Sequence, residues 1–317
     1  MRELSSEAAR PTPAAQKRMS AWAYIKREKM LYIMMLPVMI YFIIYHYIPM
    51  LGIVIAFKNY SPVAGIIDSP WVGLMYFENL FQSPDFFLVL KNTVIISLYR
   101  LMFGFTAPII LSLLINEIGN TKYKKIIQTI SYLPHFLSWV IVAGLISTML
   151  SVDGPINTLL GLFGIEKQQM LTNSSMFRGI LVVTGIWKEV GWGTLFYLAA
   201  IAGINSELYE AARIDGASRW KQTLYITLPS IKGVVVILLI MQAGTVMNAG
   251  YEQVLLLQNP MVRNVSEILD TYIYKTGLQN SNYSFATAVG FFKCVVNMIL
   301  ILTTNLISKR MGEEGLW

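Results

Sequence analysis

The sequence predicts an all-α membrane protein with six transmembrane helices. Hydrophobic residues make up 55% of its 317 positions and charged residues only 14%, and the mean hydropathy is +0.54. Soluble domains carry roughly 25% charged residues, so lipid is the expected solvent. Six apolar runs are long enough to cross ~30 Å of hydrocarbon. They cover residues 31–57, 86–115, 125–150, 178–203, 233–257 and 285–308.

Residues 1–29, before the first run, are predicted to form a cytoplasmic or interfacial N-terminal segment. They are polar, and the apolar run that follows is too long for the h-region of a signal peptide and lacks a small-residue cleavage pattern. The stretch "MSAWAYIKREK" at 19–29 combines two aromatic residues with four charges. That composition suits a helix lying on the inner leaflet, and a solvated leader is the alternative.

Prolines occur inside the first three runs and predict kinked helices around a cavity. They are Pro37, Pro49, Pro108 and Pro134. Prolines are tolerated in transmembrane helices where neighbouring helices satisfy the freed carbonyl groups. The predicted external connections contain turn formers and short amphipathic pieces at 155–163 and 265–276. No internal repeat is visible, so a symmetric partner would have to be another chain.

Basic residues set the orientation of the six runs. They are concentrated in the N-terminal segment, in the second–third and fourth–fifth connections and in the C-terminal tail. The residues of these segments are Arg2, Arg10, Lys17, Arg18, Lys26, Arg27, Lys29, Lys122, Lys124, Lys125, Arg213, Arg219, Lys221, Lys232, Lys309 and Arg310. The positive-inside rule therefore predicts that both termini are cytoplasmic. This topology explains the net charge of +7, so no nucleic-acid partner is predicted.

The sequence lacks the motifs of nucleotide, metal and redox chemistry. It has no G-x-x-x-x-G-K-[ST] loop and no H-E-x-x-H motif, and its two histidines, His46 and His135, lie in different runs. The single Cys294 excludes an intrachain disulfide and is predicted to be a small packing residue. We therefore expect no catalytic residues, no metal site and no cofactor. A membrane enzyme acting on lipid-linked sugars is the remaining enzymatic alternative, and it would need acidic residues clustered at one membrane face.

A charged, alanine-rich stretch, "EAARIDGASRWKQTLYITLPS" at 210–230, interrupts the apolar pattern. Residues 206–214 predict a helix with Ser206 as its N-cap. Asp215–Gly216 predicts a sharp turn, because glycine adopts positive φ at low cost. A second helix, "ASRWKQTLYI", is predicted to end ahead of Pro229. The segment is thus a short helix–turn–helix on the cytoplasmic face, with an ordinary solvated loop as the alternative.

This stretch resembles the EAA loop of permease subunits in bacterial ABC importers, whose pattern is E-A-A-x-x-D-G-A, a gap, and then an apolar residue and L-P. The matching residues are Glu210, Ala211, Ala212, Asp215, Gly216, Ala217, Ile226, Leu228 and Pro229. The resemblance implies a MetI-like permease domain over residues 30–308, a coupling loop at 204–232 that docks on an ATPase subunit, and a cytoplasmic tail at 309–317. ATP and Mg would then be bound by that separate ATPase.

Further segments are similar to the branch of these permeases that imports oligosaccharides from plant or algal polysaccharides. They include "LPVMIYFIIYHYIPMLGIVIAFKNY", "LKNTVIISLYR", "YLPHFLSWVIVAG", "VDGPINTLL" and "SKRMGEEGLW". The resemblance implies a subunit of the bacterial cytoplasmic membrane that moves oligosaccharides inward by alternating access. It implies a paralogous permease, an ATPase dimer and an extracytoplasmic solute-binding protein as partners. A permease of the same architecture for another solute, such as glycerol phosphate, is the alternative.

Polar and aromatic residues inside the predicted spans are candidates for a substrate path. Ionisable groups are costly at membrane depth and tend to face a cavity or a partner, and aromatic faces beside hydrogen-bonding groups suit a sugar. The candidates are Arg100, Trp187, Lys188, Glu189, Trp192, Asn248, Glu252, Lys293 and Asn297. Structural ion pairs are the alternative for the charged ones.

The charge balance within the spans favours an anionic substrate such as a uronate oligosaccharide. Basic residues at depth outnumber acidic ones, and a cation left unpaired in a low dielectric is unfavourable. The residues in this balance are Lys91, Arg100, Lys188 and Lys293 against Glu189 and Glu252. Lys91 could instead reach the outer interface, and Lys188 could pair with Glu189.

Overall fold

The computed structural model describes residues 28–310 and residue 312, and these residues form helices and their connections. The one extended pairing within this described part is an isolated bridge between Lys58 and Trp71. Helices satisfy their backbone donors and acceptors internally, which hydrocarbon demands. The predicted leader before residue 28, and the end of the tail at 313–317, lie outside the described residues. The chain divides into two units, residues 1–53 and 54–317.

The first predicted run forms one continuous helical segment, Lys29–Phe57, which begins in the first unit. It consists of α2 (Lys29–Phe42), η1 (Ile43–Tyr47), α3 (Ile48–Met50) and η2 (Leu51–Phe57). The η1 segment is a π-helical turn that lies directly before Pro49. Proline lacks an N–H group and its ring clashes with the carbonyl four residues earlier, so a wider turn accommodates it.

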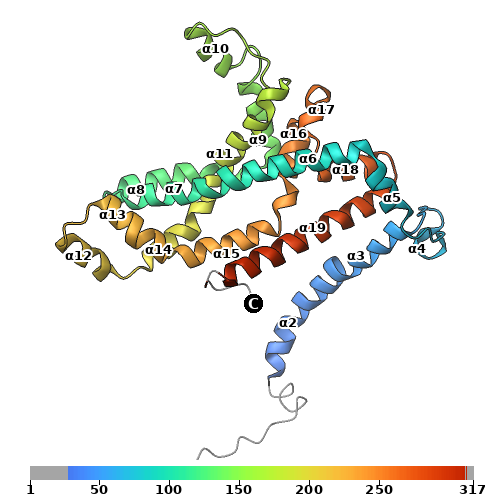
Figure 1. Cartoon of the computed structure of the whole chain (residues 1–317), viewed down its shortest axis with the longest axis horizontal. Helices are drawn as coiled ribbons and strands as arrows, with labels where there is room; N and C mark the ends of the chain where they lie inside the picture. The colour runs from blue at the N-terminus through green and yellow to red at the C-terminus, as the bar shows by residue number, and fades with distance from the viewer. Residues whose placement is uncertain (1–27, 311, 313–317) are drawn as a thin grey trace, which may run out of the picture. The chain divides into compact units, whose positions relative to one another are not determined.

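The second unit contains the remaining helices, which Figure 1 shows from blue (α4) through green and yellow to red (α19). In chain order they are α4 (Gly65–Asp68), α5 (Met75–Gln82), α6 (Pro84–Tyr99), η3 (Arg100–Gly104), α7 (Phe105–Asn116), α8 (Thr121–Tyr132), η4 (Leu133–Phe136), α9 (Trp139–Met149), α10 (Pro155–Leu162), α11 (Ser174–Ala202), α12 (Ser206–Ile214), α13 (Arg219–Gln222), η5 (Thr223–Thr227), α14 (Leu228–Ser230), α15 (Lys232–Ala243), η6 (Val246–Asn248), α16 (Tyr251–Leu257), η7 (Pro260–Val262), α17 (Arg263–Ser266), α18 (Leu269–Tyr274), η8 (Lys275–Gln279) and α19 (Tyr283–Arg310).

Three described helical segments are long and apolar enough to cross a membrane by themselves: Lys29–Phe57, Pro84–Asn116 and Tyr283–Arg310. Counting each of two bent helix pairs as one span raises the number to five. The fourth predicted run forms α11, which has 29 residues but carries Lys188 and Glu189 near its middle and is not among these segments. Six spans therefore remain a prediction, while the all-helical architecture is confirmed.

Two of the predicted runs are not straight helices. The third bends by 103° between Phe136 and Trp139, because Ser138 adopts an extended backbone and caps the start of α9. The fifth run is interrupted: α15 ends at Ala243, and the left-handed residues Ala249 and Gly250 separate η6 from α16. The prediction of one continuous fifth helix over 233–257 is therefore wrong.

Helix α11 is the centre of the second unit and packs against α7 and α8. Glycine permits the closest of these approaches. A Cβ atom on Gly191 would lie 1.9 Å from the backbone carbonyl oxygen of Ser131, and one on Gly193 would lie 2.8 Å from Cγ of Pro108. Cys294, by contrast, is exposed on α19, so the prediction that it packs inside this chain is wrong.

Candidate functional site

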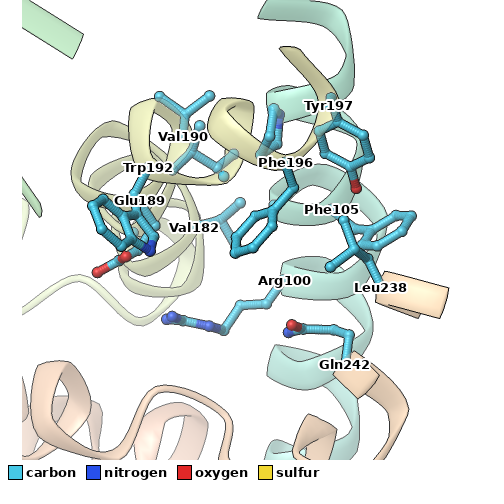
Figure 2. Close-up of a pocket in the computed structure, with 15 residues that line it drawn as sticks. Arg100, Phe105, Val182, Glu189, Val190, Trp192, Phe196, Tyr197, Leu238 and Gln242 are labelled. Atoms are coloured by element: carbon cyan, nitrogen blue, oxygen red, sulfur yellow. The ribbon is translucent and has the colours of Figure 1, made fainter. Parts of the chain in front are cut away.

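A cavity of about 300 Å³ lies where η3, α7, α11 and α15 meet. Its lining combines charged, amide and aromatic groups, several of which are shown in Figure 2. The residues used below are Arg100, Glu189, Trp192, Phe196, Tyr197 and Gln242. Arg100 is the seventeenth residue of the 33-residue segment Pro84–Asn116, and Glu189 is near the middle of α11. The cavity is therefore at mid-span depth.

Arg100 reaches this cavity from the π-helical turn η3 (Figure 2). Its Nη1 donates to Oε1 of Gln253 at 2.6 Å. Gln253 is fully buried, and its Nε2 donates to the Leu181 carbonyl at 2.9 Å and to Oγ1 of Thr184 at 2.7 Å. A flipped amide would turn donors toward the guanidinium and an acceptor toward a carbonyl, so the network fixes the amide orientation.

Glu189 is held by two basic partners on the other side of the cavity. Its Oε2 lies 2.7 Å from Nδ1 of His135, and its Oε1 lies 3.2 Å from Nζ of Lys188. Lys188 is buried, donates to the His135 carbonyl at 2.9 Å and lies 5.4 Å above the ring of Trp139. The structural ion pair that was the alternative interpretation of Lys188 and Glu189 is thus present.

His135 was not among the predicted site residues, because it lies 54 residues from Glu189 in a different run. The bend after η4 brings it against α11, where its ring stacks on Trp192 with centroids 4.5 Å apart. Trp192, one of the residues predicted for the substrate path, lines the cavity. Trp187 does not line this cavity, nor the one around Asn248 and Lys293. It is 43% exposed on α11.

A second cavity, of about 580 Å³, contains three of the predicted residues: Asn248, Glu252 and Lys293. Lys293 is paired with Asp270, whose Oδ2 lies 2.7 Å from its Nζ. Asp270 was assigned to an external connection from the sequence, so the predicted excess of positive charge at depth omitted it. Asn297 does not line this cavity, and its Oδ1 is buried without a hydrogen-bond partner.

An acidic residue in the connection after α16 is also neutralised. The Glu267 side chain is 1% exposed, accepts from Nε of Arg263 and lies 2.9 Å from Nζ of Lys275. Nearby, Arg178 donates to Oδ1 of Asn92 at 2.7 Å and joins α11 to α6. Arg263 and Lys275 thus neutralise the Glu267 carboxylate, whereas Arg178 is bonded to neutral groups, the Asn92 amide and the Val265 carbonyl.

The predicted coupling loop forms the helix–turn–helix that its sequence indicates. Helix α12 covers Ser206–Ile214, but its N-cap is Asn205, whose Oδ1 accepts from the Glu207 amide at 3.0 Å. The prediction of Ser206 as cap is wrong by one residue, because Asn205 already has the extended backbone of a cap. Gly216 makes the turn at φ 73°, and Ser218 caps α13.

The second helix of the loop does not end before Pro229. The helical segment Arg219–Ser230 continues through it and meets α15 at 58°. The π-helical turn η5 contains Tyr225, which is four residues before Pro229. In the same way, η3 contains Gly104, which is four residues before Pro108. The predicted stop is therefore wrong because a widened turn accommodates the ring, as it does at Pro49 in the first unit.

Accessible and supporting residues alternate along the coupling loop. The exposed residues are Glu210, Ala211, Asp215, Gly216 and Pro229, whereas Ala212, Ala217, Ile226 and Leu228 are partly buried. Two large apolar side chains are exposed beside them, Ile214 at 87% and Trp220 at 74%. Arg219 pairs with Glu117 at 3.2 Å and attaches the loop to the end of α7. Figure 1 shows α12 at one end of this unit, away from α10.

A helical membrane protein with polar groups around a cavity at mid-span is typical of a transport protein. Residues 104–313 match the family model described as "Binding-protein-dependent transport system inner membrane component". The chain is 47% identical to the polygalacturonan/rhamnogalacturonan transport system permease protein YteP of Bacillus subtilis (strain 168), over 95% of this chain and 94% of that protein. It is 45% identical to the protein LplB of the same organism, over 97% of each chain.

Solved structures agree with the sequence comparisons. The fold is similar to a chain of a bacterial alginate ABC transporter in complex with an alginate pentasaccharide-bound periplasmic protein. The TM-score is 0.88 at 42% identity, covering 94% of this chain and 100% of that chain. This chain belongs to the family of inner membrane components of binding-protein-dependent transport systems. It is a multi-pass transport subunit, which confirms the predicted permease class and excludes the membrane-enzyme alternative.

Proposed function

We propose that this chain is the permease subunit of an ATP-driven importer that moves acidic oligosaccharides into the cytoplasm by alternating access. Arg100 is the observation that carries the proposal. It brings a guanidinium to a cavity at mid-span depth, and no carboxylate pairs with it among the described residues. The relatives named above transport polygalacturonan, rhamnogalacturonan and alginate by their names and titles, and such chains carry carboxylates.

The lining of the cavity supports a sugar ligand. Sugars have apolar C–H faces and polar rims, which suit aromatic rings beside hydrogen-bonding groups. Trp192 and Phe196 supply rings, and Gln242 and Arg100 supply polar groups. A volume of about 300 Å³ is at the lower limit of ~300–1,000 Å³ for small-molecule sites, so a short part of an oligosaccharide would occupy it at one time. Asn248 and Glu252 would belong to the same path in the second cavity.

The proposed assembly follows from the cytoplasmic basic segments and the coupling loop. Both termini and α12 would lie on the cytoplasmic side. A paralogous permease would complete the path, and a solute-binding protein would deliver the sugar from outside. An ATPase dimer would bind ATP and Mg and dock on the exposed face of the loop, where Glu210, Ile214 and Trp220 are accessible.

The transport proposal is tested with the chain and its co-purified subunits in proteoliposomes. Uptake of uronate and neutral oligosaccharides of equal length is measured with ATP inside and the binding protein outside. We expect uptake of the uronate to exceed that of the neutral sugar. Glycerol phosphate is added as a competitor, since it represents the alternative solute and is also anionic. Uptake of glycerol phosphate without uptake of either sugar would contradict the proposal.

The coupling role is tested at Gly216, where φ is 73° and a Cβ would meet nothing within 4 Å. Gly216→Val should distort the turn, because a β-branched residue is strained at positive φ. We expect lower substrate-stimulated ATPase activity with unchanged sugar binding by the binding protein. Gly164→Val is the matched control, since Gly164 has φ 75° and equally open surroundings in the connection after α10. Equal activity of the two variants would refute coupling through this loop.

A further inference from the structure

Arg100 is the one basic residue, among those described, that lines the cavity of about 300 Å³, and most of its N–H donors have no hydrogen-bond partner there. A guanidinium has five N–H donors, and a single hydrogen bond, to the neutral Gln253, is present among the described residues. The other basic groups differ in this respect. Lys188 has Glu189, and Lys293 has Asp270. A charge at mid-span is costly, and Glu189 attracts the guanidinium only at a distance, with no ion pair between them among the described residues. An anion that visits, or water, would complete its partners.

The backbone around the guanidinium is shaped to receive it. A Cβ on Gly250 would lie 2.2 Å from Nη1 of Arg100, and one on Gly185 would lie 3.3 Å from the same atom. Gly250 lies in the break between η6 and α16 with φ 77°, a conformation that glycine adopts without strain. The break that removes a continuous fifth helix thus makes room for the Arg100 head group.

The nearest acidic residue of the cavity is already occupied. Both carboxylate oxygens of Glu189 have partners, His135 on Oε2 and Lys188 on Oε1. Moving Glu189 onto Arg100 would leave the buried Lys188 ammonium without its carboxylate, which is strongly unfavourable. Glu189 therefore stays with its own partners, and the arginine remains available.

We infer that Arg100 determines specificity by binding a substrate carboxylate in the cavity, with Gln253 positioning its guanidinium. The planar fork of arginine matches a carboxylate in two parallel hydrogen bonds, which lysine cannot reproduce. Gln253 holds one edge of the group through a neutral acceptor, which orients it without cancelling its charge. This inference rests on the proposed function, because it names the residue that would recognise the acidic sugar.

The test compares uronate and neutral oligosaccharides in the same proteoliposomes for wild type and four variants. Arg100→Gln should lower the uronate-to-neutral uptake ratio about tenfold to a hundredfold, because charge-assisted hydrogen bonds are lost. Arg100→Lys should restore the ratio only in part. Gln253→Glu keeps the arginine but supplies a competing carboxylate, so it should lower the ratio as well. Lys293→Met, which removes a paired cation, should reduce uptake of both sugars by the same factor.

Equal loss of both sugars in Arg100→Gln would overturn the inference and indicate a structural role or pairing with a carboxylate of the partner permease. A normal ratio in Gln253→Glu would overturn it too, and this variant retains the arginine if Arg100→Gln fails to assemble. A wild type that shows no uronate preference would refute the acidic-substrate proposal itself. A wild type that prefers uronate, together with variants that keep the preference, would leave that proposal standing and remove Arg100 from it.

Discussion

Replacing Gly191 by alanine should separate α11 from α8 and destabilise the protein. The added Cβ would lie 1.9 Å from the Ser131 carbonyl oxygen and 2.3 Å from its carbonyl carbon. Real Cβ contacts are essentially never under 3.0 Å, so one helix must move by more than about 1 Å in a close-packed interior. Overpacking costs about 1–3 kcal/mol, and a backbone obstacle that cannot rotate away places this site near the upper limit. Alanine's better helix propensity returns about 1 kcal/mol, which leaves a net loss of about 2 kcal/mol.

Two other glycines provide the scale for this measurement. Gly179 lies in the same helix with nothing within 4 Å of a Cβ, so Gly179→Ala should be neutral or stabilising by about 1 kcal/mol. Gly193→Ala should fall between the two, since its Cβ would meet Pro108 at 2.8 Å. The measurement is thermal unfolding of the detergent-solubilised complex, followed by tryptophan fluorescence. From highest to lowest, the midpoints should follow the order Gly179→Ala, wild type, Gly193→Ala, Gly191→Ala. Equal midpoints for the first and last variants would refute the packing argument.

Three further outcomes are expected. Glu267→Gln should destabilise the protein by about 1–3 kcal/mol, because two basic partners lose a buried carboxylate but remain partly solvated. Asp153→Asn, which removes one partner of an exposed ion pair, should lower the unfolding midpoint much less. A hydrogen bond from Lys167 and the charge of Lys167 hold the pKa of Asp153 below its usual range. The small stabilisation from this pair is therefore present above about pH 4 and is lost as the pH falls through the folded-state pKa. NMR titration of the Asp153 carboxylate can follow this loss. In a Cys294→Ser background, a membrane-impermeant thiol reagent should label a cysteine at Asp215 only from the cytoplasmic side and one at Glu166 only from outside, and the reverse pattern would invert the topology.

Hydropathy and local turn chemistry were sufficient to predict the helical architecture and the helix–turn–helix at 206–230, whereas its coupling role is predicted from the family resemblance. Apolar runs of 24 or more residues and the Asp215–Gly216 turn depend on neighbouring residues alone, so the sequence is enough to predict them. The helix limits were less predictable where proline is involved. The sequence before a proline does not show whether the preceding turn will widen into a π-helical turn. The continuation of the helical segment Arg219–Ser230 through Pro229 could therefore not be predicted.

The composition of the cavities depended on contacts between distant segments, which no spacing rule encodes. Asp270 and Lys293 are 23 residues apart across a turn, and His135 meets Glu189 only because the third run bends by 103°. Charge counting within spans therefore selected Lys293 as a substrate-binding cation, whereas the structure gives it a carboxylate. The same counting selected Arg100, for which the structure supplies a glutamine.

Helix α11 links the cavity to the coupling loop mechanically. Glu189 and Trp192 lie in the cavity lining, and α12 begins at Ser206, after the three-residue connection that follows Ala202. The 14 residues from Glu189 to Ala202 form uninterrupted helix, about 20 Å long at 1.5 Å per residue. We expect a force applied at the loop to pass through the three-residue connection to Ala202 and then along this rigid helix to the cavity. Two contacts join α11 to the α8 segment: Gly191 lies against Ser131 in α8, and Glu189 is bonded to His135, which follows α8 in the chain. We therefore expect α8 and α11 to move as one body.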